Sequence, residues 1–130
     1  MSIIQSIELF TAINLAAIGV SHFFQPKSWV SFFQFLHAKK EVGNLFNAML
    51  SLGMGSIIFS FHFIWSGPMI LVTIYGLTLT LKGFIYFIFP TVGINSIGKV
   101  NMEKAHKFKI VGFIMMAFAF WIFYYLIIKR

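Results

Sequence analysis

Four long apolar stretches follow one another along the chain, and each contains only isolated polar residues. They cover about residues 3–24, 43–65, 69–89 and 108–128. A helix needs roughly 20 such residues to cross the hydrocarbon core of a bilayer, and it satisfies its backbone hydrogen bonds internally. The pattern therefore predicts an all-α integral membrane protein, in which the 130 residues form one transmembrane four-helix bundle.

Turn-forming residues mark the expected helix ends. Pro26 follows the first stretch, Pro90 follows the third, and the Ser-Gly-Pro segment 66–68 joins the second to the third. Proline has no amide hydrogen to donate and fits the first turn of a helix better than its interior. We expect the first and third helices to stop before these prolines, the second and third to form a tight hairpin, and the fourth to begin near Asn101 as its N-cap.

The connection after the first span carries an aromatic stripe at helical spacing. The stripe consists of Trp29, Phe32, Phe33 and Leu36, with polar residues elsewhere around the helix. This pattern predicts a short amphipathic helix. Such a helix would lie in the plane of the membrane interface or fold back against the inner end of the bundle, and the stripe fits both arrangements. The connection 91–105 shows a weaker pattern of the same kind.

Composition and charge agree with a membrane protein. Hydrophobic residues make up 59% of the chain and charged residues 10%, against roughly 25% charged residues in a soluble domain. The net charge of +7 is not concentrated in one patch, because the lysines flank the apolar stretches, as they do at a cytoplasmic membrane face. We therefore expect the lipid bilayer as a partner and no nucleic acid. The lack of cysteine excludes disulfides and thiolate metal sites.

The basic residues also predict the orientation. Four crossings place the first and third connections on one side of the membrane and both termini on the other. Seven lysines lie on the first side and only Lys129 and Arg130 on the second, so the positive-inside rule places both termini outside the cytoplasm of a bacterial inner membrane. No Lys or Arg precedes Lys27, so we expect the first stretch to be a mature helix and not a signal peptide. The seven are Lys27, Lys39, Lys40, Lys99, Lys104, Lys107 and Lys109.

A shift of the sequence by 64 residues aligns its two halves. Each half then contains a span with a late glycine, an aromatic run, a proline, a basic connection and a second span. This predicts two tandem two-helix repeats related by an axis along the membrane normal; the alternative is that two spans followed by proline arose independently. The aligned pairs are Gly19 with Gly83, Phe23 with Phe87, and Pro26 with Pro90.

Small and weakly polar residues line one face of each central span. At helical spacing such residues let two helices approach closely and form hydrogen bonds, which supports the hairpin of the second and third spans. Gly53, Ser56 and Ser60 form an adjacent face of the second span. The matching faces are Asn44, Asn47, Ser51 and Gly55 on the second span and Thr73, Gly76, Thr80 and Gly83 on the third.

Lys82 is the one cation well inside a span, and such a residue needs water, phosphate or a partner. It shares a face of the third span with Tyr75, Thr78 and Tyr86. One interpretation is a lysine that snorkels to the interface; the other is a site for an anionic head group or a substrate carbonyl. Similar depth predicts that the ligand-binding candidates converge in the inner half of the bundle. These candidates are Lys82, His22, Asn47, Ser51 and Tyr86.

A second polar cluster is expected at the outer end of the bundle. Glu8 of the first span and His62 of the second lie at similar depth, and Lys129 and Arg130 end the fourth span nearby. We expect Glu8 to be a surface acid paired with one of these residues; the alternative is a proton-relay carboxylate. Neither His37 nor His106 has partners at ligand spacing, so no metal site is expected.

The stretch 17–26, Ala-Ile-Gly-Val-Ser-His-Phe-Phe-Gln-Pro, followed by Trp29, resembles the end of the first helix in DoxX-like small bacterial membrane proteins. The resemblance covers about the first 30 residues and the number of spans. It implies a four-helix inner-membrane fold. Some members of that family are associated with oxidoreductase complexes and quinone-linked sulfur chemistry, and the lack of cysteine here argues against a thiol-based role.

No catalytic constellation is visible in the sequence, which has only three carboxylates for acid–base work. We therefore predict a non-catalytic component or accessory subunit of a membrane assembly, with no catalytic residues and no required cofactor. The first alternative is a small-molecule carrier that works as a homodimer around the Lys82 region. The second, which the resemblance implies, is a redox subunit with quinone or lipid as its ligand.

Overall fold

The computed structural model describes residues 1–129, and within them every regular element is helical. Four helices are long and apolar enough to cross a membrane, namely α1, α3, α4 and α6 with its flanking turns. This confirms the prediction of an all-helical chain with four candidate spans. The helices are α1 (Ile3–Phe24), α2 (Pro26–Ala38), α3 (Lys40–Phe61), α4 (Ile70–Ile88), α5 (Pro90–Ile97) and α6 (Ala105–Tyr124), with a 3-10 turn at Met102–Lys104 and a π-helical turn at Tyr125–Lys129.

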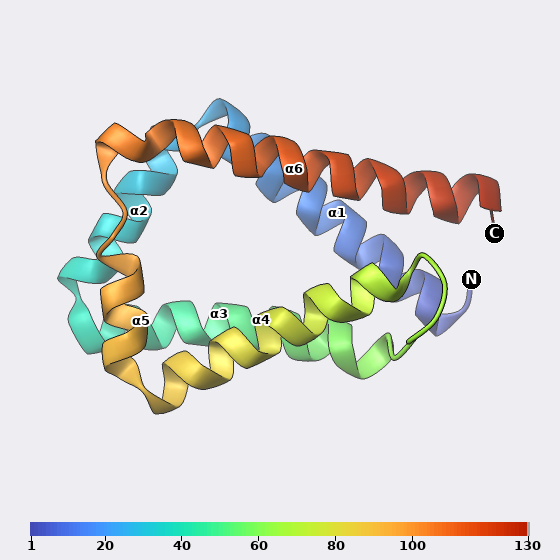
Figure 1. Ribbon diagram of the computed structural model, residues 1–130, viewed down its shortest axis with the longest axis horizontal. Coiled ribbons are helices and arrows are strands. Elements are labelled where there is room, and N and C mark those ends of the chain that lie inside the picture. The colour runs from blue at the N-terminus through green and yellow to red at the C-terminus, as the bar shows by residue number, and fades with distance from the viewer. Residues whose placement is uncertain (130) are drawn as a thin grey trace.

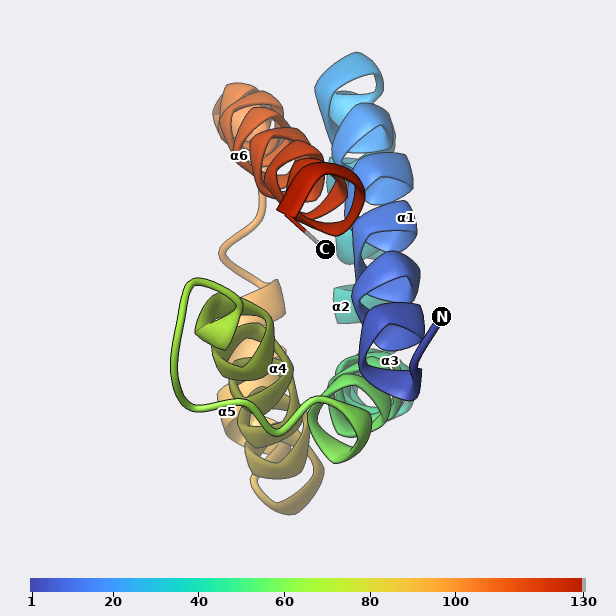
Figure 2. The same cartoon turned by 90° about the vertical axis from the view of Figure 1, so that its right-hand side faces the viewer.

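The four long helices are arranged as two pairs (Figures 1 and 2). Helix α1 packs along α6, and α3 packs along α4. The pairs approach one another at the end that holds both termini and diverge toward the other end, where the short helices α2 and α5 lie (Figure 1). A buried core at the termini end joins the pairs with residues from all four long helices. Its fully buried members are Ala12, Leu15, Ile58, Met69, Val72, Ala119 and Ile122.

Helices α3 and α4 are in backbone contact through small residues. A Cβ atom at Gly83 would stand 2.5 Å from the Leu52 amide nitrogen, and one at Gly55 would overlap the Thr80 backbone. Only glycine allows so close an approach. The predicted hairpin of these two spans, with its matching faces of small residues, is therefore confirmed.

Helices α1 and α6 pack in the same way, although the sequence predicted no partner for Gly19. A Cβ atom at Gly19 would stand 2.9 Å from the Gly112 carbonyl oxygen and 3.0 Å from the Met116 amide nitrogen. Met116 corresponds to Leu52 under the 64-residue shift, just as Gly19 corresponds to Gly83. The two helix pairs thus use equivalent contacts. Other equivalent positions that are buried in both halves are Ala12 with Gly76, Gly55 with Ala119, and Ile58 with Ile122.

The observed helix boundaries differ most from the predicted ones in the second and fourth spans, and the third span differs by one residue at each end. The second span ends at Phe61 and not at residue 65, because His62 leaves the helix to make the contacts described below. The fourth span begins at Ala105 and not at residue 108, and Asn101 caps the preceding 3-10 turn by accepting a hydrogen bond from the Lys104 amide at 3.1 Å. Both Pro26 and Pro90 begin the following short helix, as expected of residues that fit a first helical turn.

The aromatic stripe after the first span folds back against the long helices. The Trp29 indole Nε1 donates a hydrogen bond to Ser21 Oγ of α1 at 2.8 Å, and the Phe33 ring stacks on Phe108 of α6 with centroids 5.9 Å apart. Val30 and Leu36 are buried in this helix. These contacts match the second of the two predicted arrangements for α2.

Candidate functional site

A buried polar cluster joins three of the long helices at the termini end. His62 Nε2 lies 2.9 Å from Glu8 Oε1, and His62 Nδ1 lies 2.7 Å from Thr73 Oγ1. All three side chains have no exposed surface. Glu8 belongs to α1, His62 follows α3, and Thr73 lies in the first turn of α4. The cluster therefore ties the α1–α6 pair to the α3–α4 pair.

The end of α3 explains how this cluster forms. The His62 amide still donates to the Ile58 carbonyl at 2.9 Å, but the chain then leaves the helix. Thr73 Oγ1 donates to the His62 carbonyl and accepts from the Ile64 amide, each at 3.2 Å. One threonine hydroxyl thus replaces helical hydrogen bonds at this corner, where unpaired backbone groups would be costly.

The hydrogen bonds of the cluster satisfy its buried polar groups. Thr73 Oγ1 accepts from the Ile64 amide, and His62 Nδ1 at 2.7 Å and the His62 carbonyl at 3.2 Å both lie within reach of its hydroxyl group. His62 Nε2 faces the Glu8 carboxyl group on the other side of the ring. Each of the two buried side chains therefore has a polar partner, which offsets the cost of removing it from water.

The predicted surface position of Glu8 is wrong, although the structure pairs it with one of its three expected partners, His62. Glu8 shares a face of α1 with Thr11, Ala12 and Leu15, and this whole face is buried. Its spacing of i, i+3, i+4 and i+7 is the signal that could have placed Glu8 inside. Of the other two expected partners, Lys129 is exposed and Arg130 lies outside the described residues.

Thr73 was expected only on a helix-packing face and not in a site. The signal that would have placed it beside His62 is the short turn between α3 and α4. Residues equally far from the middle of a hairpin turn face each other, and His62 and Thr73 are such a pair, as are Gly55 with Thr80 and Leu52 with Gly83.

Four of the five inner candidates lie on the α3–α4 pair. Asn47 and Ser51 are buried on α3, whereas Lys82 is exposed on α4. The Lys82 ammonium lies 5.8 Å from the centre of the Tyr86 ring, a distance at which a cation is attracted to an aromatic face. The structure thus brings Lys82 and Tyr86 together.

Tyr86 also connects three helices. Its hydroxyl donates to Ser96 Oγ of α5 at 2.9 Å, and its carbonyl accepts from Asn44 Nδ2 of α3 at 2.9 Å. Asn44 was expected only on a packing face, and its amide group secures α3 to the last turn of α4. Tyr86 therefore helps to hold α3, α4 and α5 together.

His22, the fifth candidate, lies on the α1–α6 pair. Its ring is 4.1 Å from the Trp29 ring and 5.4 Å from the Phe108 ring, between centroids. Its Nδ1 lies 2.9 Å from the Ile18 carbonyl oxygen. His22 corresponds to Tyr86 under the 64-residue shift, so the two occupy equivalent positions on different helix pairs and the five candidates are divided between those pairs.

Among residues 1–129, no group of three or more His, Cys, Asp or Glu side chains is placed to hold a metal ion. His37 instead contacts α5, where its Nδ1 lies 3.2 Å from the Ile94 carbonyl oxygen.

Comparison with protein-family models, with curated proteins and with solved structures finds no match for this chain. The DoxX-like resemblance of residues 17–29 therefore stays a prediction.

Proposed function

We propose that this chain is a small multi-pass membrane protein that serves as a non-catalytic subunit of a membrane assembly. The four candidate spans expose large apolar side chains, with Phe120 and Ile127 at the C-terminal end of the chain 78% and 74% exposed. A stable water-soluble protein does not leave apolar surface on this scale exposed to water. Lipid or a partner helix is the environment that suits these faces.

The observation that carries the subunit proposal is the open face of small residues on α3. A Cβ atom at Gly53 would have no neighbour within 4 Å, while Ser60 is exposed and Ser56 is half-buried on the same face. Helices in membranes associate through such faces because small residues allow close backbone contact. The small residues that bind α4, such as Gly55, lie on the opposite side of α3 and not on an adjacent face as predicted. The open face therefore has the composition to receive another helix.

This proposal can be tested with variants that fill the open face. The tagged chain would be purified from membranes in mild detergent, and copurifying proteins identified by mass spectrometry. Gly53→Leu combined with Ser56→Leu should remove the partner without lowering the thermal unfolding midpoint, because a Cβ atom at Gly53 meets no neighbour within 4 Å and leucine favours a helix more than glycine does. Ala117→Leu, on an exposed face of α6, is the matched control. A chain that purifies without any protein partner, or that keeps it in the Leu variant, would contradict the subunit role.

A second function is favoured by a hollow beside His22. This hollow has a volume of about 200 Å³. The Ile18 carbonyl accepts from His22 Nδ1–H, which leaves Nε2 as the acceptor of the ring. An acceptor among aromatic rings suits a quinol hydroxyl, in line with the redox role that the DoxX-like resemblance implies. Extraction of quinone from the parent and from His22→Phe would test this role. The hollow is lined by His22, Phe33, Lys107, Phe108 and Val111.

The alternative of a dimeric carrier rests on Lys82, which is exposed on α4 beside Tyr86. In a dimer, two copies of this face would form the transport path. Cysteine crosslinking at Thr78, on the same face, would detect that arrangement, since the chain has no native cysteine.

We further propose that both termini face away from the cytoplasm of a bacterial cell. The termini and the α3–α4 turn lie at one end of the molecule, and α2 and α5 lie at the other (Figure 1). The lysines gather in and around α2, α5 and the start of α6, and the positive-inside rule assigns that end to the cytoplasm.

A further inference from the structure

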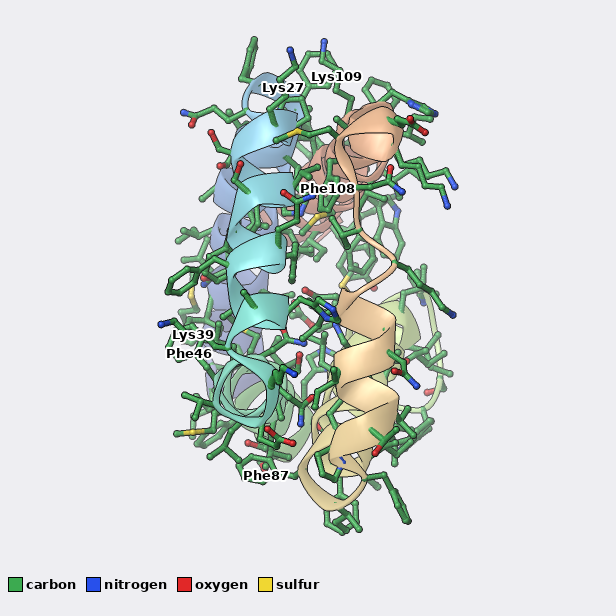
Figure 3. All side chains as sticks on the ribbon, turned by 90° about the vertical axis from the view of Figure 1, so that its left-hand side faces the viewer. Lys27, Lys39, Phe46, Phe87, Phe108 and Lys109 are labelled. Atoms are coloured by element: carbon green, nitrogen blue, oxygen red, sulfur yellow. The ribbon has the colours of Figure 1, made fainter. Side chains whose placement is uncertain are left out.

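Two lysines from different helices line an open hollow at the end of the molecule where α2 and α5 lie. The hollow has a volume of about 440 Å³, and Lys27 of α2 and Lys109 of α6 contribute its charged groups. Figure 3 shows the two lysines next to each other at this edge of the molecule. The remaining lining residues are Phe24, Gln25, Pro26 and Ser28.

We propose that this hollow binds the phosphate headgroup of an anionic phospholipid, with phosphatidylglycerol as the representative ligand. Ammonium groups close to the membrane surface attract anionic headgroups, and basic pockets between spans are the places where such lipids bind specifically. The Ser28 hydroxyl adds a hydrogen-bond donor for phosphate oxygens. Phe24, the last residue of α1, is 73% exposed beside the lysines and offers an apolar wall to the acyl chains.

Contacts with α1 hold the surroundings of both lysines in place. Trp29, two residues after Lys27, is fixed to α1 by its hydrogen bond to Ser21 Oγ. The Lys109 ammonium lies 5.2 Å from the centre of the Phe23 ring of α1, a distance at which a cation is attracted to an aromatic face. A site that is already formed before the ligand arrives loses less conformational entropy on binding.

The second half of the chain shows that the fold does not require these lysines. The two halves share their helix contacts and the proline that begins the short helix, so the α4–α5 junction is the structural counterpart of the α1–α2 junction. The two charged groups of the hollow are nevertheless missing there. Lys27, Ser28 and Lys109 correspond to Thr91, Val92 and Leu45. Charge at only one of two equivalent corners points to a ligand at that corner.

The test measures phosphatidylglycerol binding to detergent-purified full-length protein. Lipid retained per chain would be counted by mass spectrometry, and affinity would be obtained by titrating the lipid against the thermal unfolding midpoint. Each lysine near an anionic headgroup contributes roughly a five-fold change in affinity. Lys27→Gln combined with Lys109→Gln should therefore weaken binding roughly 25-fold, whereas Lys27→Arg with Lys109→Arg should keep it.

The matched control is Lys99→Gln with Lys104→Gln, which removes the same charge from exposed lysines outside the hollow. The control should leave affinity within roughly two-fold, because neither lysine lines the hollow and exposed charges are screened by salt. Equal loss in control and test variants would overturn the proposal, as would unchanged binding in the Gln variant. If the double variant does not fold, Lys27→Gln alone should show its roughly five-fold loss.

Two further arms define the ligand. Phosphatidylcholine should not replace phosphatidylglycerol, because its headgroup has no net charge. Inorganic phosphate that binds as tightly as the lipid would overturn the lipid assignment in favour of a free phosphate site. The inference rests on the proposed membrane placement and not on the subunit role, so a protein without any protein partner could still bind lipid here. A chain recovered from cells without detergent would overturn both this inference and the membrane placement.

Discussion

His62 Nε2 lies 2.9 Å from Glu8 Oε1, although the two residues are 54 positions apart in the chain and neither side chain has exposed surface. Loss of one member of a buried pair leaves the other without its partner and costs about 3 kcal/mol or more. We expect Glu8→Ala and His62→Ala each to lower the free energy of unfolding by about that amount, measured by thermal unfolding in detergent. The double variant should lose less than the sum, because the two side chains interact.

The second half of the chain supplies an apolar replacement for this pair. Under the 64-residue shift, Glu8 corresponds to buried Val72 and His62 to partly buried Leu126. Glu8→Val combined with His62→Leu should therefore be more stable than either alanine variant, since apolar residues of similar size can replace a buried ion pair. Glu41→Ala, at an exposed acid of α3, is the control and should be silent. A silent Glu8→Ala would contradict the structural role of the pair.

The glycine contact between α3 and α4 predicts a sharp contrast between two substitutions. Gly83→Ala places a methyl group 2.5 Å from the Leu52 amide nitrogen and should destabilise the protein by about 2 kcal/mol, as overpacking does. Gly53→Ala meets no atom within 4 Å and should gain about 0.5 kcal/mol from helix propensity. Thermal unfolding of the two variants in the same detergent would measure the difference, and equal midpoints would argue against backbone contact at Gly83.

The contacts of α2 predict that Phe33 contributes more to the free energy of unfolding than Phe35 does. Phe33→Ala removes the ring that stacks on Phe108 and should lower stability by about 2 kcal/mol, given that Phe33 is partly buried. Phe35→Ala, at a side chain that is 58% exposed, should have a much smaller effect in detergent. Replacing Phe32 and Phe33 together with Asp should release the segment 28–38 to a water-soluble probe. Unchanged accessibility of that segment would contradict the contact with α6.

Variants of Lys82 distinguish a lysine that only snorkels to the membrane interface from one that binds an anionic ligand. If it only snorkels, Lys82→Arg should be silent, and Lys82→Met should be neutral or stabilising because a charge leaves the apolar region. If it holds an anionic ligand, Lys82→Met should lose that ligand while the fold stays intact. Thermal stability and copurifying ligands would be measured side by side, with Lys99→Met as an exposed control. A Met variant with parental stability and parental ligands would exclude the ligand role.

The orientation is tested by reporter fusions. A periplasm-active reporter fused after residue 130 should be active, and the same reporter inserted after Lys39, between α2 and α3, should be inactive. A cytoplasm-active reporter should show the opposite result at both positions. Activity of the cytoplasmic reporter at the C-terminus would reverse the proposed orientation.

Much of this fold could be predicted from local patterns in the sequence. The faces of small residues on α3 and α4 indicate a close hairpin because the turn between them is short, so the partner of each helix is defined. The stripe containing Phe33 similarly predicts α2. For α1, no short turn defines a partner, and its contact with α6 through Gly19 and Gly112 depends on the whole chain.

The buried cluster could be predicted only in part. Equal depth brings Glu8 and His62 to the same level of the bundle, but depth does not specify which side of a helix faces inward. The end of α3 has no local signal, because the residues after His62 continue the apolar run; it depends on the Thr73 hydroxyl from the next helix. His22 and Tyr86 share a depth because they occupy equivalent positions in the two halves, and they lie apart because each half places its position on a different helix pair.

The two helix pairs form two stiff arms that are joined at one end of the molecule. Glycine contacts fix each pair internally, while the core and the Glu8–His62 bond join the pairs at the termini end. The 22 residues of α1 correspond to an arm of about 33 Å. A rotation of about 5° between the pairs would move the far ends by about 3 Å. Helix α2 bridges this far end through its contacts with α3, α5 and α6, so the packing of one short helix fixes the angle between the two pairs.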